Sequence, residues 1–355
     1  MKEHYNYNSL YNKIEKWQKE GSQDKILLEN LFGQIVLYSH PKTRGDEDLQ
    51  YGTKYSGLET SDLFSLFEAN TFNQLNKEDL QHLMQEVHNR MMEKNDRFVR
   101  RNVEVLNQVW DPYTYGFINS SNTLLGINGF PIFYSKYMPR NNKLLNKDSV
   151  GKIYLSVVLH ETEHNEQYER ALDFADGINM NKYDSFMGAL MLISNTNYRV
   201  SEKRGDLRYQ RRCESMYDYH TYEHEANYVA IKNMEKMYPE KLKNSESYKK
   251  AIDFYGKISL HFDTDKNSNE NEERCKKRVE YMENYVKEQL EYFEKYVTDC
   301  PLKQKIVDSI NEYITVDEKG NSPYRKRFNK EVKELCDLCE KYSTKNRNQE
   351  KNQLV

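Results

Sequence analysis

Two histidines and a glutamate stand at a chemically useful spacing in the run His160-Glu161-Thr162-Glu163-His164. Histidines four positions apart on a helix lie one turn above the other, about 6 Å apart. Both imidazoles can then reach one tetrahedral Zn²⁺ at roughly 2.0–2.1 Å. Glu161 would lie beside that ion, where its carboxylate can take a proton from zinc-bound water. The spacing therefore predicts one catalytic zinc ion held by His160 and His164, with Glu161 as the general base.

A second run, Glu223-His224-Glu225-Ala226-Asn227, follows further along the chain. An apolar segment that ends in Gly126-Ile127-Asn128 precedes both runs. In this order, residues about 115–232 resemble a gluzincin-type zinc metallopeptidase and are similar to thermolysin-like minimal catalytic cores. The resemblance covers about a third of the chain. It implies peptide-bond hydrolysis with a peptide or protein as the substrate.

The resemblance also implies the rest of the metal site. A gluzincin takes its third zinc ligand from a glutamate on a downstream helix, which points to Glu223. Asn227 lies four positions later on the same helix face, where it can hydrogen-bond a ligand histidine. Glu225 is a rival third ligand, and the spacing to Asn227 favours Glu223. The 63 positions between His160 and Glu223 exceed the separation in compact members of the family.

Substrate binding and charge stabilisation need further groups. The strand Thr123–Asn128 is expected to be an exposed sheet edge that pairs with an extended peptide through Leu125, Gly126 and Ile127. A donor to the oxyanion is expected among the aromatic residues just before Glu223, with Tyr219 and His220 favoured by their shared face with Glu223.

The elements that must carry these groups can be read from local patterns. Residues 103–106, 115–118 and 123–128 have strand character, the last two joined by a turn at 119–122, and a further apolar piece occupies 131–134. Helix N-cap residues at 146–149 predict a helix over about 148–175 that carries both histidines. A second helix is predicted from about residue 218. These patterns predict an α+β fold that is mostly helical, with a small antiparallel β region before the active-site helix.

Periodicity and polar linkers suggest a division of the chain. We expect a helical N-terminal region at residues 1–95 and a zincin-like core at 96–238. A helical C-terminal region at 239–344 and a disordered tail at 345–355 complete the chain. Within the C-terminal region, 263–273 is expected to be a polar linker, and 279–297 a long amphipathic helix.

Composition limits the class of partner. Lysine and arginine number 53 against 56 acidic residues, which gives a net charge of -3 and none of the basic character of a nucleic-acid binder. No run approaches the 18 apolar residues typical of a membrane span, and the N-terminus lacks an apolar signal segment. The five cysteines are widely spaced. We therefore expect a cytoplasmic protein with reduced thiols, no nucleic-acid partner and no membrane contact; the oligomeric state is left open.

Several alternatives stay open at this level. One alternative is a zinc site that acts on a non-peptide amide or ester, and another is a catalytically inactive zincin fold used for interaction. Gln167 is either a contact of a ligand histidine or a solvated helix residue. His220 and His224 form a second histidine pair, and the arginines at 204, 208, 211 and 212 form a basic cluster expected to be salt-bridged. Cys336 and Cys339 are expected to be buried thiols.

Overall fold

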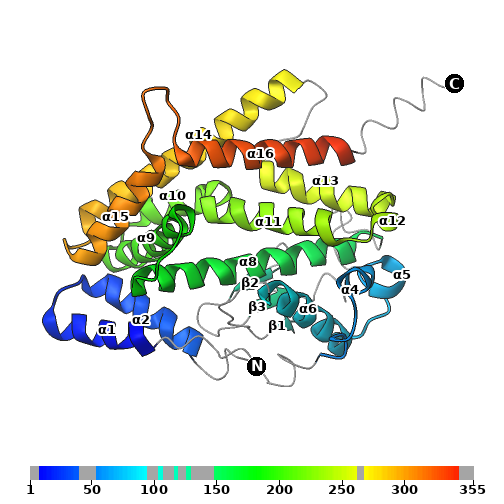
Figure 1. The fold of residues 1–355 in the computed structure, drawn as a ribbon, viewed down its shortest axis with the longest axis horizontal. Coiled ribbons are helices and arrows are strands. Elements are labelled where there is room, and N and C mark those ends of the chain that lie inside the picture. Colours follow the sequence, from blue (N-terminus) through cyan, green and yellow to red (C-terminus); the bar gives the residue numbers. More distant parts are fainter. Residues whose placement is uncertain are drawn as a thin grey trace. The chain divides into compact units, whose positions relative to one another are not determined.

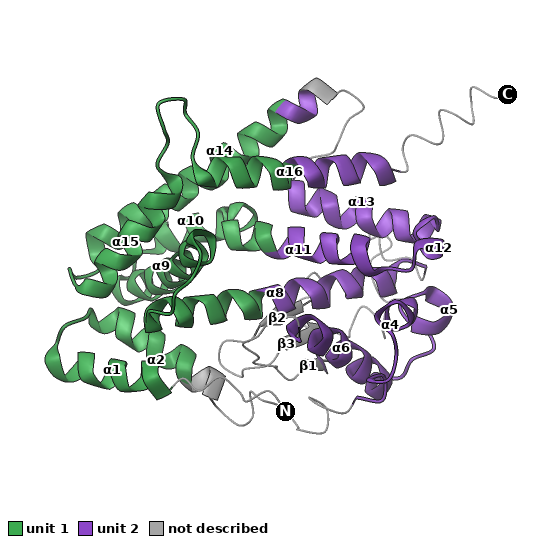
Figure 2. Ribbon diagram, in the orientation of Figure 1, with its two compact units in different colours: residues 1–40, 164–225, 273–332 green, residues 41–163, 226–272, 333–355 purple. Residues whose placement is uncertain are grey.

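The structure is a computed structural model, and it describes residues 8–39, 53–93, 103–106, 116–118, 125–128, 148–261 and 268–343. Its described residues form two compact units, each built from three separate stretches of chain (Figures 1 and 2). Unit 1 comprises Met1–His40, His164–Glu225 and Glu273–Val332. Unit 2 comprises Pro41–Glu163, Ala226–Glu272 and Lys333–Val355. Four helices run from one unit into the other, so each unit is described below by its own residues.

Every regular element that the structure describes in unit 1 is a helix. Its helices are α1 (Asn8–Glu20), α2 (Lys25–Ser39), the second part of α8 (Val150–Asp176), α9 (Lys182–Arg204), α10 (Leu207–Ser215), the 3₁₀ turn η2 (Tyr217–Tyr219), the first turn of α11 (Thr221–Met237), most of α14 (Ser268–Tyr296), α15 (Pro301–Ile314) and the first half of α16 (Pro323–Tyr342).

Helix α9 forms the centre of unit 1. Its run from Phe186 to Ile193 is buried, and both α2 and α15 pack against it. The Phe186 ring stacks on Tyr313 of α15 with centroids 4.4 Å apart, and Asn30 of α2 donates to Thr196 of α9. Full burial of such apolar side chains contributes about 1.5–3 kcal/mol each, so α9 depends for its stability on helices from both ends of the chain.

Unit 2 combines short helices with a small sheet. Its elements are α4 (Thr60–Ser65), α5 (Ala69–Phe72), α6 (Lys77–Met92), β1 (Val103–Leu106), β2 (Gly116–Ile118), β3 (Leu125–Asn128), the first part of α8, most of α11, α12 (Glu240–Lys243), α13 (Glu246–Leu260), the start of α14 and the end of α16.

The sheet has the strand order β1-β3-β2. β1 pairs with β3 in parallel, with Val103 opposite Leu125, and β2 pairs with β3 antiparallel, with Gly116 opposite Ile127. β3 is therefore the central strand. The N–H group of Val103 donates to Gln85 of α6, which ties the start of β1 to that helix.

The α+β class predicted from the sequence is wrong. The described residues are predominantly helical, and the fold belongs to the all-α class. Its described β structure is limited to three strands of four, three and four residues, and their sheet is mixed rather than antiparallel. Local strand patterns do mark these segments, but strands this short cannot form a layer with a core of its own. Packed helices supply the core instead.

The two helices that carry the candidate site form close to their predicted positions. α8 begins at Val150, directly after Ser149, whose carbonyl accepts from the N–H of Ile153. α11 begins at Thr221 rather than residue 218, because residues 217–219 form the 3₁₀ turn η2. α14 begins at Ser268, so the second half of the predicted linker at 263–273 is helical.

The compact units follow other boundaries than the predicted regions 1–95, 96–238 and 239–344. Contacts distant in sequence define the units, and local periodicity does not encode them. The predicted turn at 119–122, the apolar piece at 131–134 and the predicted tail at 345–355 lie outside the described residues. No described helix is long and apolar enough to cross a membrane.

Candidate metal centre

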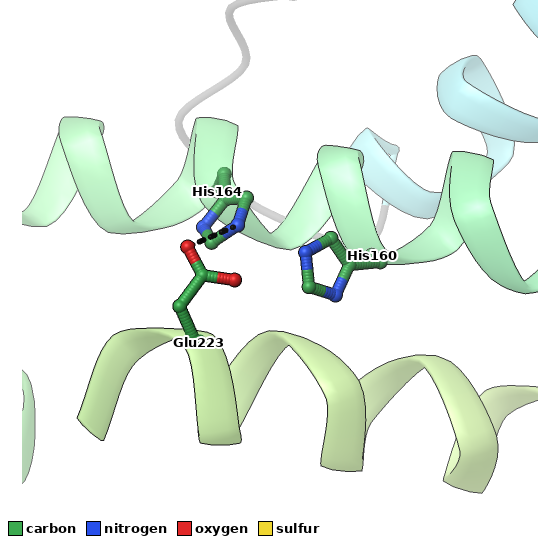
Figure 3. Close-up of side chains that lie close together, drawn as sticks. All are labelled: His160, His164 and Glu223. Atoms are coloured by element: carbon green, nitrogen blue, oxygen red, sulfur yellow. Dashed lines mark ion pairs between the residues drawn. The ribbon is translucent and has the colours of Figure 1, made fainter. Parts of the chain in front are cut away.

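Helices α8 and α11 bring three potential metal ligands together. One nitrogen each of His160 and His164 and one carboxylate oxygen of Glu223 lie within 4.8 Å of one another. Figure 3 shows the two imidazoles on successive turns of α8, facing the Glu223 carboxylate on α11. Nε2 of His164 is 3.5 Å from Oε1 of Glu223. Such a group can hold a metal ion, and it is the group predicted from the sequence.

The cluster keeps limited contact with solvent. The relative exposure of His160, His164 and Glu223 is 9%, 8% and 6%, and that of Glu161 is 6%. The residue immediately behind His164, Gln167, is 0% exposed. The ligand residues thus keep a small exposed fraction, whereas Gln167 behind His164 is fully enclosed.

Gln167 determines which nitrogen of His164 carries the hydrogen. Nε2 of Gln167 donates to the Tyr222 carbonyl at 2.9 Å and to the Glu225 carboxylate at 2.8 Å. Both partners are pure acceptors, so the amide must present its NH₂ to them and its oxygen to His164. That oxygen lies 2.8 Å from His164 Nδ1. It can only accept, so Nδ1 donates and the lone pair of neutral His164 lies on Nε2, toward Glu223.

Glu225, the rival third ligand, is engaged elsewhere. Its carboxylate accepts from Gln167, from Nη1 of Arg170 at 3.0 Å and from the hydroxyl of Tyr183. Burial raises the pKa of Glu225, but the Arg170 charge and the hydrogen bonds from Tyr183 and Gln167 together hold that pKa below its usual value. Burial and the Glu225 charge raise the pKa of Tyr183. Glu225 is thus a buried anion within a hydrogen-bond network and does not join the metal cluster.

Asn227 does not take the predicted position behind a ligand histidine. It is half-buried on α11, and within the described chain it makes no hydrogen bond to His160 or His164. Gln167 bonds to His164 instead, from the same helix three residues on. The i, i+4 spacing of Glu223 and Asn227 placed both on one helix but could not specify which group meets the imidazole.

The predicted oxyanion donors lie on the segment before Glu223. Tyr219 contacts α14, with its ring 5.7 Å from Tyr281 and the Arg278 guanidinium 5.4 Å from its centroid. His220 is buried, and its Nδ1 hydrogen-bonds the hydroxyl of Tyr222. The Tyr222 ring meets the His164 ring edge-on with centroids 6.2 Å apart. The aromatic residue beside a ligand histidine is therefore Tyr222, a member of the same sequence cluster that the helix-face argument did not favour.

Burial also sets the protonation of this aromatic pair. It lowers the pKa of His220 to about 4, against an ordinary value of 6.5. Burial and the nearby Glu223 charge raise the pKa of Tyr222 well above its usual range. At neutral pH the pair is a neutral imidazole bonded to a protonated phenol.

The predicted substrate strand is not an exposed edge. Leu125, Gly126 and Ile127 of β3 pair with β1 on one side and with β2 on the other. Their backbone groups face neighbouring strands on both sides, so this strand cannot accept an extended peptide in the predicted way. Parallel pairing with β1 places a third strand where the sequence suggested an open edge.

Glu161 and Glu163 flank the ligand face of α8. At 100° per residue, each lies about 80° from the midpoint between His160 and His164, on opposite sides. Thr162 points away, toward α6, where its hydroxyl bonds Nδ1 of His88 at 2.9 Å. The face of the motif helix opposite the ligands is therefore polar at Thr162 and buried.

The other sequence features belong to packing or surface pairs. His224 is fully buried, with Nε2 3.5 Å from Glu331, so it does not share a site with His220. In the basic cluster, Arg212 pairs with Glu288 and Arg204 lies over the Tyr296 ring. Cys336 and Cys339 are buried in α16, as predicted.

Comparisons with protein-family models, with curated proteins and with solved structures find no match. The resemblance to gluzincins therefore rests on the residues and the geometry above.

Proposed function

We propose that the protein is a zinc-dependent hydrolase of gluzincin type that cleaves peptide bonds, with His160, His164 and Glu223 holding one Zn²⁺. The observation that carries the proposal is that two acceptors face each other. The Nε2 lone pair of His164 and the Glu223 carboxylate are 3.5 Å apart, and two acceptors repel at that distance unless a cation lies between them. A second imidazole within reach favours a metal ion over a single proton.

The donor set suits zinc in kind and in separation. Two imidazoles and one carboxylate are a common catalytic zinc shell, which leaves one position for water or substrate. A tetrahedral ion with bonds of about 2.1 Å holds its ligand atoms about 3.4 Å apart. The His164–Glu223 separation of 3.5 Å is close to that value, and all three ligand atoms, that of His160 included, lie within 4.8 Å of one another.

Such an ion supplies Lewis acidity and lowers the pKa of water toward neutrality. Glu161 accepts the proton of the attacking water and later delivers it to the leaving amine. The oxyanion needs a hydrogen-bond donor, which we assign to the segment 219–222. Tyr222 joins the predicted donors Tyr219 and His220, because its protonated phenol lies on a residue packed against His164.

The decisive experiment compares Glu161→Gln with Glu163→Gln. Both glutamates flank the ligands, yet only Glu161 has the assigned role of base. We expect wild type and both variants to hold one zinc per chain by elemental analysis. Cleavage of a fluorogenic peptide library should fall at least 100-fold in Glu161→Gln and stay near wild type in Glu163→Gln.

Three results would contradict the proposal. The first is wild-type protein that lacks zinc after purification without chelators. The second is a His164→Ala variant that retains the metal. The third is a Glu161→Gln variant that cleaves as well as wild type, which would indicate an inactive zincin fold used for interaction.

The central position of β3 supports a second candidate. An enzyme without an open strand at Leu125–Ile127 lacks the predicted means of binding a peptide backbone. Hydrolysis of a non-peptide amide or ester uses the same ion and base without that strand. A panel of amide and ester substrates beside the peptide library separates the two.

A location in the cytoplasm is part of the proposal. It is supported by the cysteines, none of which is in a disulfide. A peptide or protein substrate is the only partner proposed.

A further inference from the structure

A polar network behind His164 has no part in the proposed reaction. Each of its four side chains makes at least one hydrogen bond within it. It joins Gln167 and Arg170 of α8, Tyr183 of α9 and Glu225 of α11. Every partner lies in unit 1. Gln167 is 0% and Glu225 is 2% exposed. Burying a polar group destabilises the folded state unless the group is hydrogen-bonded. A buried network of this size therefore calls for an explanation.

We propose that Gln167 is a positioning residue of the metal centre: it holds His164 with its Nε2 lone pair toward Glu223, and Glu225 with its partners fixes the orientation of Gln167. This inference rests on the proposed zinc function. It assigns a role to Glu225, which the sequence offered as a rival ligand, and to Gln167, whose contact with a ligand histidine the sequence left open.

Hydrogen-bond polarity carries the argument from one group to the next. Arg170 and Tyr183 only donate to the Glu225 carboxylate, so that carboxylate is left as an acceptor for Gln167. The Tyr222 carbonyl, one residue before Glu223, is a second acceptor for the same NH₂ group. Flipping the amide would therefore face its oxygen to two acceptors. The amide has one orientation, and His164 has one tautomer.

The network also couples both ligand helices. Gln167 is three residues from His164 on α8, and its acceptors Tyr222 and Glu225 flank Glu223 on α11. The same amide thus sets the imidazole tautomer and fixes the register of the two helices at the ligand pair. Partners of ligand histidines typically change metal affinity by 10–100-fold when removed.

The principal test replaces Gln167 with methionine, which has similar volume and no amide. We expect Gln167→Met to weaken zinc binding by about 10–100-fold in competition with a chelator of known affinity. The visible spectrum of the Co²⁺-substituted protein should change, because His164 would ligate less well. A residue of purely structural importance would lower stability without altering that spectrum.

The matched control is Gln85→Met. Gln85 is also a fully buried helical glutamine that uses both ends of its amide, donating to Asn89 and accepting from Val103. It should lose stability while its zinc affinity stays within about twofold of wild type. Wild-type affinity and an unchanged Co²⁺ spectrum in Gln167→Met would overturn the positioning role.

An exchange of donor and acceptor tests the network further. Gln167→Glu alone places a carboxylate against Glu225 and should weaken zinc binding. Adding Glu225→Gln restores a donor opposite an acceptor, so the double variant should recover affinity relative to Gln167→Glu. Absence of recovery would contradict the polarity argument.

A measurement on the unaltered chain keeps the inference testable if variants fail to fold. Long-range ¹H–¹⁵N spectra of metal-free wild type under alkaline conditions should show His164 as the Nδ1–H tautomer. The Nε2–H tautomer would overturn the inference. If wild type instead binds no zinc at all, the proposed function fails, and this result is distinct from tight zinc binding that is indifferent to Gln167.

Discussion

At the scale of single residues, spacing and motif identified the cluster of His160, His164 and Glu223 on α8 and α11. The sequence did not specify which side chains hold these three residues in place. His160 and His164 are local neighbours on a helix, and Glu223 followed from a motif. Contact of Gln167 with His164, three positions away, was one of the interpretations that the sequence left open, and it is the one found. The other partners of Gln167 are 55 and 58 positions away in the chain, so local spacing alone could not decide between this contact and a solvated side chain. Asn227 was preferred on local grounds and is not hydrogen-bonded to either histidine.

Buried histidines make the stability of the protein sensitive to acid. The pKa of His220 is about 4 when folded and 6.5 ordinarily, and burial also lowers the pKa of His224. Between these limits the unfolded chain binds a proton that folded His220 does not. Stability therefore rises with pH through this window and falls on acidification from pH 6.5 toward 4.

For His220 alone, the free energy of unfolding should drop by about 3 kcal/mol over that range. Urea titrations at several pH values measure it, in a His164→Ala background so that metal loss does not contribute. His220→Gln should flatten the dependence, while His82→Gln serves as the control. An equal slope in the His220→Gln variant and its parent would contradict this assignment.

At the scale of elements, the helix and strand positions followed from local patterns, but their pairing did not. β1, β2 and β3 fall within the predicted strand segments. The parallel contact of β1 with β3, however, joins residues 22 positions apart along the chain. That contact turned a predicted edge into a central strand. Strand propensity depends on neighbouring residues, and sheet order depends on the whole chain.

A close contact between α8 and α9 gives a prediction at this scale. A Cβ atom on Gly188 would lie 2.5 Å from the Arg170 carbonyl oxygen and 2.9 Å from Cβ of Phe174. Gly188→Ala should therefore destabilise the protein by about 1–3 kcal/mol, despite a gain in helix propensity of up to about 1 kcal/mol.

Chemical unfolding of Gly188→Ala beside Gly57→Ala measures this effect. Gly57 has open space around its Cβ position and should tolerate alanine within about 0.5 kcal/mol. Equal stability of the two variants would mean that α8 and α9 do not approach as described. Arg170 also belongs to the Gln167 network, so a shift of α9 should weaken zinc binding as well.

At the scale of the whole molecule, the compact units do not follow contiguous stretches of chain. Each unit draws on three stretches of chain, and α8, α11, α14 and α16 each contribute residues to both units (Figure 2). The predicted core at residues 96–238 contains α9 but lacks α2 and α15. These two helices pack against α9. Linker composition could not reveal this division, because four of the five unit boundaries fall inside helices.

We expect a fragment of residues 96–238 to lack a cooperative fold. Its α9 would expose Phe186, Ile193 and the apolar residues between them. The fragment should show poor proton chemical-shift dispersion and broad thermal unfolding, whereas the full chain should unfold cooperatively. A sharp transition of the fragment would indicate that the metal-binding helices form an autonomous domain.

The low exposure of His160, His164 and Glu223 would affect how fast a bound metal ion exchanges with solution. In the proposed centre, an ion held by side chains that are only 6–9% exposed would leave when α8 and α11 separate or when the side chains swing outward. The lifetime of the bound ion is then governed by the frequency of that opening and not by bond strength alone. Chelators would strip the centre slowly, at a rate independent of their concentration, and the chain would acquire its metal most readily during folding.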